Sequence, residues 1–193
     1  MKLSAVLLAL VIAVAGCSSK PEFHGTDITG SSIGGDFSLM APDGESRSLA
    51  QFKGKAVVLF FGYTHCPDVC PTTMAVLAQA MKQLGPEADR VQVLFVSVDP
   101  ERDTPELLGR YVPAFDKRFL GLTGTPEQVA AVAKDWRAFY QKVLVQGAPA
   151  DSYSVDHFAG MYVLDREGRL RLFLRGEQPP ADVAADLKKI VEG

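Results

Sequence analysis

Continuous apolar runs alternate along the chain with segments in which apolar residues recur every three or four positions. Residues 55–61 and 91–98 are apolar runs of strand length, which predict two strands buried on both faces. Residues 71–84 and 180–191 carry apolar side chains at helical spacing. The alternation of the two patterns predicts a domain in which helices pack against a largely buried sheet.

Two further helices are predicted from their start signals. The segments 104–115 and 125–140 each open with Thr-Pro-Glu, which supplies an N-cap, a proline at the first helical position and an acid in the first turn. Two hairpins are predicted over 37–52 and 161–174 from short alternating segments around turn residues. We therefore expect an α/β fold with a central mixed sheet, flanking helices and an N-terminal hairpin.

The first residues have the pattern of an export signal. After Lys2, residues 3–15 are apolar apart from Ser4. As a helix this segment is about 20 Å long, shorter than the roughly 30 Å hydrocarbon core of a bilayer, so a signal peptide is favoured over a transmembrane anchor. Residues 14–17 (VAGC) resemble the bacterial lipobox, which implies cleavage before Cys17 and its lipidation. The alternative is an ordinary secretory signal with an incidental cysteine.

Residues 18–35 are small and polar and have no periodicity, which is typical of a flexible tether. The expected organisation is a signal peptide over 1–16, the lipidated cysteine and a tether over 17–35, and one folded domain over 36–193.

Charge and cysteine count narrow the possible functions. The formal net charge is −3, so the chain lacks the basic field that a general nucleic-acid binder needs. Of its three cysteines, lipidation would consume Cys17 and leave only Cys66 and Cys70. An exported protein lies in an oxidising compartment, so any thiol chemistry must involve this pair.

The two cysteines lie where a sheet strand passes into a helix. Residues 62–71 (GYTHCPDVCP) join the predicted strand 55–61 to the predicted helix 71–84, and ligands of α/β folds bind at such carboxyl ends of strands. If Cys66 and Cys70 share a helical turn, their Cα atoms are about 6 Å apart, which allows a disulfide or a shared metal ion. Two buried cysteines without chemistry are the remaining alternative.

A cysteine pair is an incomplete site for a soft metal, and His157 is the candidate third ligand. It lies just before the predicted strand at 161, although a lone histidine beside a strand is commonly structural. Two thiolates and one imidazole suit copper, and zinc accepts the same ligands. His65 and Met161 are weaker candidate ligands.

Three acids near these residues have open roles. Asp68 lies between the cysteines and is either a partner-recognition residue or an ordinary first-turn acid. Asp99 follows the predicted strand 91–98 and either orients a ligand or forms a turn before proline. Asp156 is expected to hydrogen-bond the second ring nitrogen of His157.

Four motifs occur in the order that is typical of one family. The segments 62–71, 97–104 (SVDPERDT), 121–125 (GLTGT) and 155–157 (VDH) closely resemble the Sco/SenC family of copper proteins. The resemblance covers roughly residues 34–187.

The resemblance implies a thioredoxin-like fold and one copper ion, as Cu(I) or Cu(II). The two motif cysteines of the family match Cys66 and Cys70, and its distant histidine matches His157. From the thiol pair itself, we expect Cys66 and Cys70 to form a reversible, redox-active disulfide pair. The implied partner is the cytochrome c oxidase subunit that carries the dinuclear copper centre, and the chain would deliver copper to this centre or reduce its cysteines.

We therefore expect a membrane-tethered metallochaperone rather than an enzyme. The alternative is a membrane-tethered thiol–disulfide oxidoreductase that reduces the cysteines of one dedicated partner. A general oxidoreductase of the thioredoxin kind is disfavoured because three residues separate the cysteines and Ala159 stands where a cis-proline is expected. A peroxiredoxin is disfavoured because Thr64 lies only two positions before Cys66, with no proline four positions before it.

The expected location is the periplasm, with the domain held at a membrane through Cys17. The oxidase partner favours the inner membrane, and Ser18 resembles a residue that permits sorting to the outer membrane.

Overall fold

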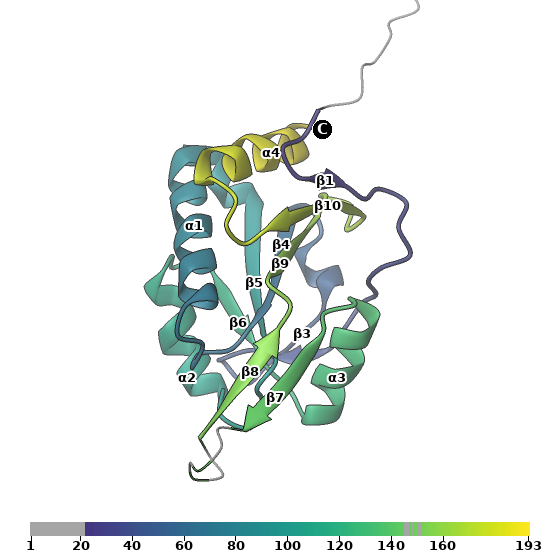
Figure 1. Cartoon of the computed structure of the whole chain (residues 1–193). Coiled ribbons are helices and arrows are strands. Elements are labelled where there is room, and N and C mark those ends of the chain that lie inside the picture. Colours follow the sequence, from purple (N-terminus) through teal and green to yellow (C-terminus); the bar gives the residue numbers. More distant parts are fainter. Residues whose placement is uncertain (1–21, 145–146, 148, 150–151) are drawn as a thin grey trace, which may run out of the picture.

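The computed structural model describes residues 22–144, 147, 149 and 152–193 (Figure 1). The predicted signal peptide, Cys17 and the first part of the predicted tether lie outside the described residues.

A six-stranded mixed sheet forms the centre of the domain, with the strand order β1-β10-β9-β4-β5-β6. The strands β4, β5 and β6 are parallel, whereas β9 runs antiparallel to β4 and β10 antiparallel to β9. Every residue of β4 is buried, as the apolar run predicts. The strands span Thr26–Asp27 (β1), Ala56–Gly62 (β4), Val91–Ser97 (β5), Leu120–Leu122 (β6), Gly160–Leu164 (β9) and Leu170–Arg175 (β10).

Helices cover both sides of this sheet. In Figure 1, α1 and α2 lie on one side, α4 packs beside α1, and α3 lies on the other side. The predicted α/β architecture with a mixed sheet and flanking helices is therefore confirmed. The helices span Val69–Leu84 (α1), Pro105–Tyr111 (α2), Pro126–Asp135 (α3) and Pro180–Glu192 (α4), with 3₁₀ turns at Leu49–Phe52, Gly85–Arg90 and Val112–Ala114.

Two small antiparallel sheets lie outside the central one. The first, β2 (Leu39–Met40) with β3 (Ser46–Arg47), is the core of the predicted N-terminal hairpin, but the end of that segment is a 3₁₀ turn rather than a strand. The second sheet, β7 (Tyr140–Leu144) with β8 (Tyr153–His157), was not predicted.

The prediction of a helix over 125–140 was wrong at its end. Helix α3 ends at Asp135, and Arg137 has a φ of 50°, in the left-handed region that helices of L-residues exclude. The chain therefore turns here and enters β7, whose first residue, Tyr140, pairs with His157, the last residue of β8.

Part of the predicted tether is packed onto the domain. Thr26–Asp27 forms the edge strand β1 against β10, and the backbone N–H groups of His24 and Gly25 donate to the Asp186 carboxylate. Gly34 has a φ of 97°, and a Cβ there would lie 3.0 Å from the Trp136 ring. A two-residue strand leaves no periodic pattern, which explains why the sequence did not reveal it.

Among the described residues, no helix combines the length and the apolar character that crossing a bilayer requires.

Candidate metal centre

The cysteines lie on the segment that leads from the buried strand β4 into α1. Cys70 is fully buried in the first turn of α1, whereas Cys66 precedes the helix and is half-buried. Both thiols are free, and the backbone N–H of Cys70 donates to the Cys66 sulfur at 3.4 Å. A Cβ on Gly62 would lie 2.8 Å from the Cys70 sulfur, so glycine at the end of β4 lets the thiol approach the sheet.

His157 is the last residue of β8 and faces the cysteines. Its Nε2 atom lies 3.3 Å from the Cys70 sulfur, and its Nδ1 atom lies 3.0 Å from the carbonyl oxygen of Phe158. A carbonyl oxygen only accepts, so Nδ1 carries the proton in this hydrogen bond. The lone pair of the neutral ring is then on Nε2, the atom that faces the thiols.

The expectation that Asp156 would hold the second ring nitrogen of His157 was wrong. The Phe158 carbonyl makes this contact instead. Asp156 precedes His157 on the same strand and its side chain is exposed. Adjacent strand residues project to opposite faces, so Asp156 points away from the group that His157 faces.

The structure brings Cys66, Cys70 and His157 together, with their ligand atoms all within 4.8 Å of one another. One ion between them would contact two sulfurs and one nitrogen. This donor set fits copper, because thiolates suit the soft Cu(I) ion and imidazole suits both oxidation states. It also accommodates zinc with a fourth ligand from solvent.

Burial sets the protonation of the metal-free group. It raises the pKa of the Cys70 thiol well above its usual range, and it lowers the pKa of His157 below its ordinary value. Both side chains are therefore neutral at pH 7 without a metal. A bound cation favours the Cys70 thiolate electrostatically, so metal binding releases a proton from this site.

Aromatic rings fix the position of the imidazole. The His157 ring meets the rings of Tyr63 and Phe60 edge-on, with centroid separations of 5.6 and 6.3 Å. The Tyr63 hydroxyl accepts a hydrogen bond from the backbone N–H of Val155 at 3.2 Å. Tyr63 immediately follows β4, so it joins the cysteine-bearing segment to the strand that carries His157.

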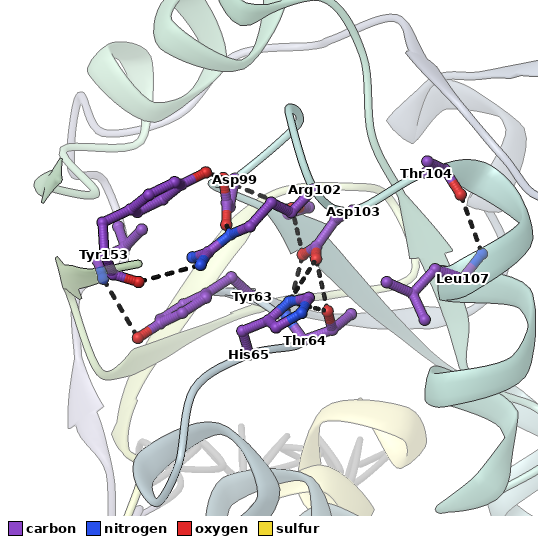
Figure 2. Close-up of polar contacts among 11 residues, drawn as sticks. Tyr63, Thr64, His65, Asp99, Arg102, Asp103, Thr104, Leu107 and Tyr153 are labelled. Atoms are coloured by element: carbon purple, nitrogen blue, oxygen red, sulfur yellow. Dashed lines mark hydrogen bonds and ion pairs between the residues drawn. The ribbon is translucent and has the colours of Figure 1, made fainter. Parts of the chain in front are cut away.

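Asp103, which sequence reasoning did not single out, holds the segment in front of Cys66. Its buried carboxylate accepts hydrogen bonds from the Thr64 N–H at 3.0 Å and the Thr64 hydroxyl at 2.6 Å (Figure 2). It also accepts from the Ser97 hydroxyl at 2.7 Å. Burial raises the pKa of Asp103, and these donors oppose that rise. The only available signal was its place in the 97–104 motif, which does not distinguish it from the neighbouring Asp99.

Asp99 does not contact the metal-site atoms. Its buried carboxylate accepts from the Arg102 Nε at 2.5 Å and from the Tyr153 hydroxyl at 2.7 Å (Figure 2). It therefore stabilises the loop after β5 and the start of β8, and its role as a direct orienter of a ligand is not supported.

His65 and Asp68 are not part of the group, and Met161 belongs to the buried core. The His65 side chain is 53% exposed, and its Nδ1 atom lies 3.1 Å from the Thr64 hydroxyl oxygen. Met161 is fully buried in the core, and Asp68 is exposed and accepts a long hydrogen bond from the Thr72 hydroxyl.

An open cavity is lined by residues that neighbour the candidate ligands in sequence. It has a volume of about 900 Å³, and its wall includes Val69, which lies between the two cysteines in sequence, and Phe158, which follows His157. The side chains that flank the candidate ligands can therefore be reached from solvent.

Comparison with known proteins identifies the family. The SCO1/SenC family model matches residues 25–192. The bovine mitochondrial SCO2 homolog is 45% identical over 139 residues, which cover 69% of this chain and 50% of that protein. A SCO2-like protein of Rickettsia felis is 32% identical over 157 residues, 81% of this chain and 76% of that protein. The chain spans about half the length of the mammalian SCO2 homologs that it matches.

Solved structures agree with this assignment. The chain is similar to Bradyrhizobium japonicum ScoI with copper bound, with 40% identity, a TM-score of 0.74 and coverage of 82% of this chain and 99% of that one. It is similar to apo Sco1 of Thermus thermophilus, with 47% identity, a TM-score of 0.76 and coverage of 87% and 96%. The expected thioredoxin-like fold is thus confirmed, and the chain belongs to the SCO1/SenC family.

Proposed function

We propose that this chain binds one copper ion through Cys66, Cys70 and His157 and passes it to a partner during assembly of cytochrome c oxidase. The observation that carries the proposal is the convergence of these two sulfurs and one nitrogen within 4.8 Å. It is supported by the likeness to structures of Sco proteins that hold copper.

The donor set suits copper as cargo in both oxidation states. Two thiolates satisfy the low coordination number of Cu(I), and the imidazole adds the nitrogen ligand that Cu(II) favours. Cys66 is only half-buried, so a partner can reach one of the three proposed ligands from solvent. A site with three protein ligands and an open side suits an ion that must leave again.

The proposed partner is the oxidase subunit that carries the dinuclear copper centre. Sco proteins are a family of cytochrome c oxidase assembly proteins, and membership of that family supports a partner of this kind. A copper centre built from cysteines takes up Cu(I) most readily from other thiolates, because the ion then exchanges between ligands of the same softness.

The same cysteines are proposed to cycle through a disulfide. Oxidation would join the two sulfurs and release two protons and two electrons, which a partner's disulfide accepts when it is reduced to two thiols. Cys66 is the more accessible of the two cysteines and receives a hydrogen bond from the Cys70 N–H, so a partner's disulfide can reach its sulfur first. This observation supports the alternative function, reduction of a dedicated partner's cysteines.

We also propose that lipidation of Cys17 holds the domain at the periplasmic face of a membrane. The support is the lipobox-like sequence before Cys17. Mass spectrometry of the N-terminal peptide from cells should show a diacylated Cys17. An unmodified N-terminus, or cleavage elsewhere, would overturn the proposed anchor.

Copper loading of the reduced full chain tests the main proposal. We expect one copper per chain and a Cu(II) spectrum with a thiolate charge-transfer band. After the Cys66–Cys70 pair has been oxidised, copper binding should be lost, since a sulfur in an S–S bond is not a thiolate ligand. Equal Cu(I) binding by the oxidised chain would refute this site.

A further inference from the structure

A set of side chains outside the metal group joins the hairpin that carries His157 to the rest of the domain (Figure 2). The guanidinium carbon of Arg102 lies 3.6 Å from the centroid of the Tyr153 ring, and the Arg102 Nη1 donates to the Tyr153 carbonyl at 3.0 Å. Asp99 is fully buried and accepts from both the Arg102 Nε and the Tyr153 hydroxyl. The loop after β5 thus holds Tyr153 by its ring face, its hydroxyl and its backbone.

These contacts act on the strand that ends at His157. Tyr153 is the first residue of β8 and His157 the last, and residues 153, 155 and 157 project to the same face because strands alternate. Tyr63 holds the middle of the strand through the Val155 N–H, and its ring meets the His157 ring. The Arg102 guanidinium carbon also lies 5.8 Å from the Tyr63 ring centroid.

Arg102 is better suited to this task than the other charged link to the hairpin. Lys142 of β7 pairs with Glu101 at 2.5 Å, but both side chains are well exposed, and such pairs contribute little. The Arg102 side chain is only 20% exposed, so its contact with the Tyr153 ring is less screened.

The scaffold satisfies the Arg102 guanidinium only in part. Its Nη2 atom is buried and has no hydrogen-bond partner in the described part of the chain. A buried donor without a partner is destabilising. An apolar side chain of similar length would avoid this cost but would not hold Tyr153 by its carbonyl and Asp99 at the same time.

We propose that Arg102 is a positioning residue for His157. By holding Tyr153 against Asp99, it fixes β8 and with it the distance between the imidazole and the two thiols. Loss of Arg102 would release His157, while Cys70 stays in the first turn of α1 and the segment in front of Cys66 stays bound to Asp103. The consequence for copper rests on the proposed function, whereas the positioning is a property of the metal-free chain.

The substitution Arg102→Met tests the proposal, with Arg110→Met as the matched control. Arg110 lies exposed on α2, and its loss changes the net charge equally. In the metal-free reduced chain, the Val155 and Phe158 amides, which bond to Tyr63 and Phe139, should exchange about tenfold faster or more in the Arg102 variant. Its Cu(II)–thiolate band should weaken or shift, while Cu(I) affinity falls by less than about tenfold. The control should match the wild type in all three measurements.

Tyr153→Phe is the milder variant and keeps the proposal testable if Arg102→Met does not fold. It retains the ring beneath the guanidinium and removes only the hydrogen bond to Asp99. The changes in amide exchange and in the Cu(II) band should therefore be smaller than in Arg102→Met.

Wild-type amide exchange and a wild-type Cu(II) band in either folded variant would overturn the proposal. Reduced thermal stability with an unchanged Cu(II) band would also overturn it, because Arg102 would then only support the scaffold. If the wild-type chain gives no His157-dependent band, the proposed function fails, and amide exchange still decides the positioning.

Discussion

Cys66 and Cys70 lie between a central strand and a long helix, whereas His157 lies at the end of a two-stranded sheet that is separate from the central one. The cysteine half is local in sequence and is anchored by fully buried β4 and by α1. The histidine half is 87 residues away from Cys70 and is held mainly by side chains of Tyr63, Asp99 and Arg102.

The difference suggests a division of roles. The thiols lie between a fully buried strand and a long helix and provide the ligands that Cu(I) requires. The imidazole belongs to an element held by a few polar and aromatic contacts, so its approach can vary without disturbing the core. Changes in the two halves should therefore affect Cu(I) and Cu(II) unequally.

Loss of a thiol is expected to have the largest effect. Cys70→Ser should lower Cu(I) affinity by about a thousandfold or more, because one of two soft ligands is replaced by a hard oxygen. Competition with a chromogenic Cu(I) chelator measures this change. Circular dichroism should show a folded chain, since serine is nearly isosteric with cysteine. Wild-type affinity in the folded variant would exclude Cys70 as a ligand.

Loss of the imidazole should separate the two oxidation states. His157→Ala leaves both thiolates, so Cu(I) affinity should fall by only about tenfold, while the Cu(II)–thiolate band should weaken or become unstable. The control is His65→Ala, because His65 neighbours Cys66 but lies outside the group. If His65→Ala removed the Cu(II) band and His157→Ala did not, the assignment of the third ligand would be reversed.

Removal of the Tyr63 hydroxyl should weaken the contact between the cysteine-bearing segment and β8. Tyr63→Phe leaves the Val155 N–H without its acceptor, which should lower the free energy of unfolding by about 1–3 kcal/mol. Chemical denaturation of the reduced chain measures this loss. Tyr140→Phe is the control, because the Tyr140 hydroxyl makes no hydrogen bond to a described residue. Equal stability of the wild type and the Tyr63 variant would show that this hydrogen bond contributes nothing to the free energy of unfolding.

The smallest expected effect is the change with pH in the stability that Asp103 contributes to the cysteine-bearing segment. Burial raises the pKa of Asp103 in the folded chain above its ordinary value of 3.8, so the folded state binds this proton more tightly. The resulting stability is fully present below pH 3.8 and is lost as the pH rises through the raised pKa. The amide of Asp103→Asn does not titrate, so this variant lacks the pH-dependent contribution. Denaturation at several pH values should therefore show wild-type stability falling relative to the variant as pH rises. A constant difference, or one of opposite slope, would contradict this sign.

The sequence revealed the cysteine half more completely than the histidine half. The strands β4 and β5 were predicted because strands buried on both faces are continuous apolar runs, and α1 because its buried face has helical spacing. The strand β7 was missed because four of its five residues are exposed, so it lacks the alternation of a half-buried strand.

The same contrast holds for the individual site residues. Cys66 and Cys70 were found from their spacing and from their place directly after a buried strand. The shared helical turn that this spacing allowed is not formed, because α1 begins at Val69 and Cys66 precedes it. His157 was only one candidate among several until the family resemblance was considered, because its approach to Cys70 depends on the hairpin. The hydrogen bond from Arg102 to the Tyr153 carbonyl joins residues 51 positions apart, and no local sequence pattern predicts such a contact.

X-ray absorption at the copper edge of the fully reduced, copper-loaded full chain tests the central claim most directly. The account predicts two sulfur ligands and one nitrogen ligand from imidazole, and loss of the imidazole contribution alone in His157→Ala. A copper ion surrounded only by nitrogen and oxygen atoms would contradict the account, as would an imidazole contribution that persists unchanged in His157→Ala.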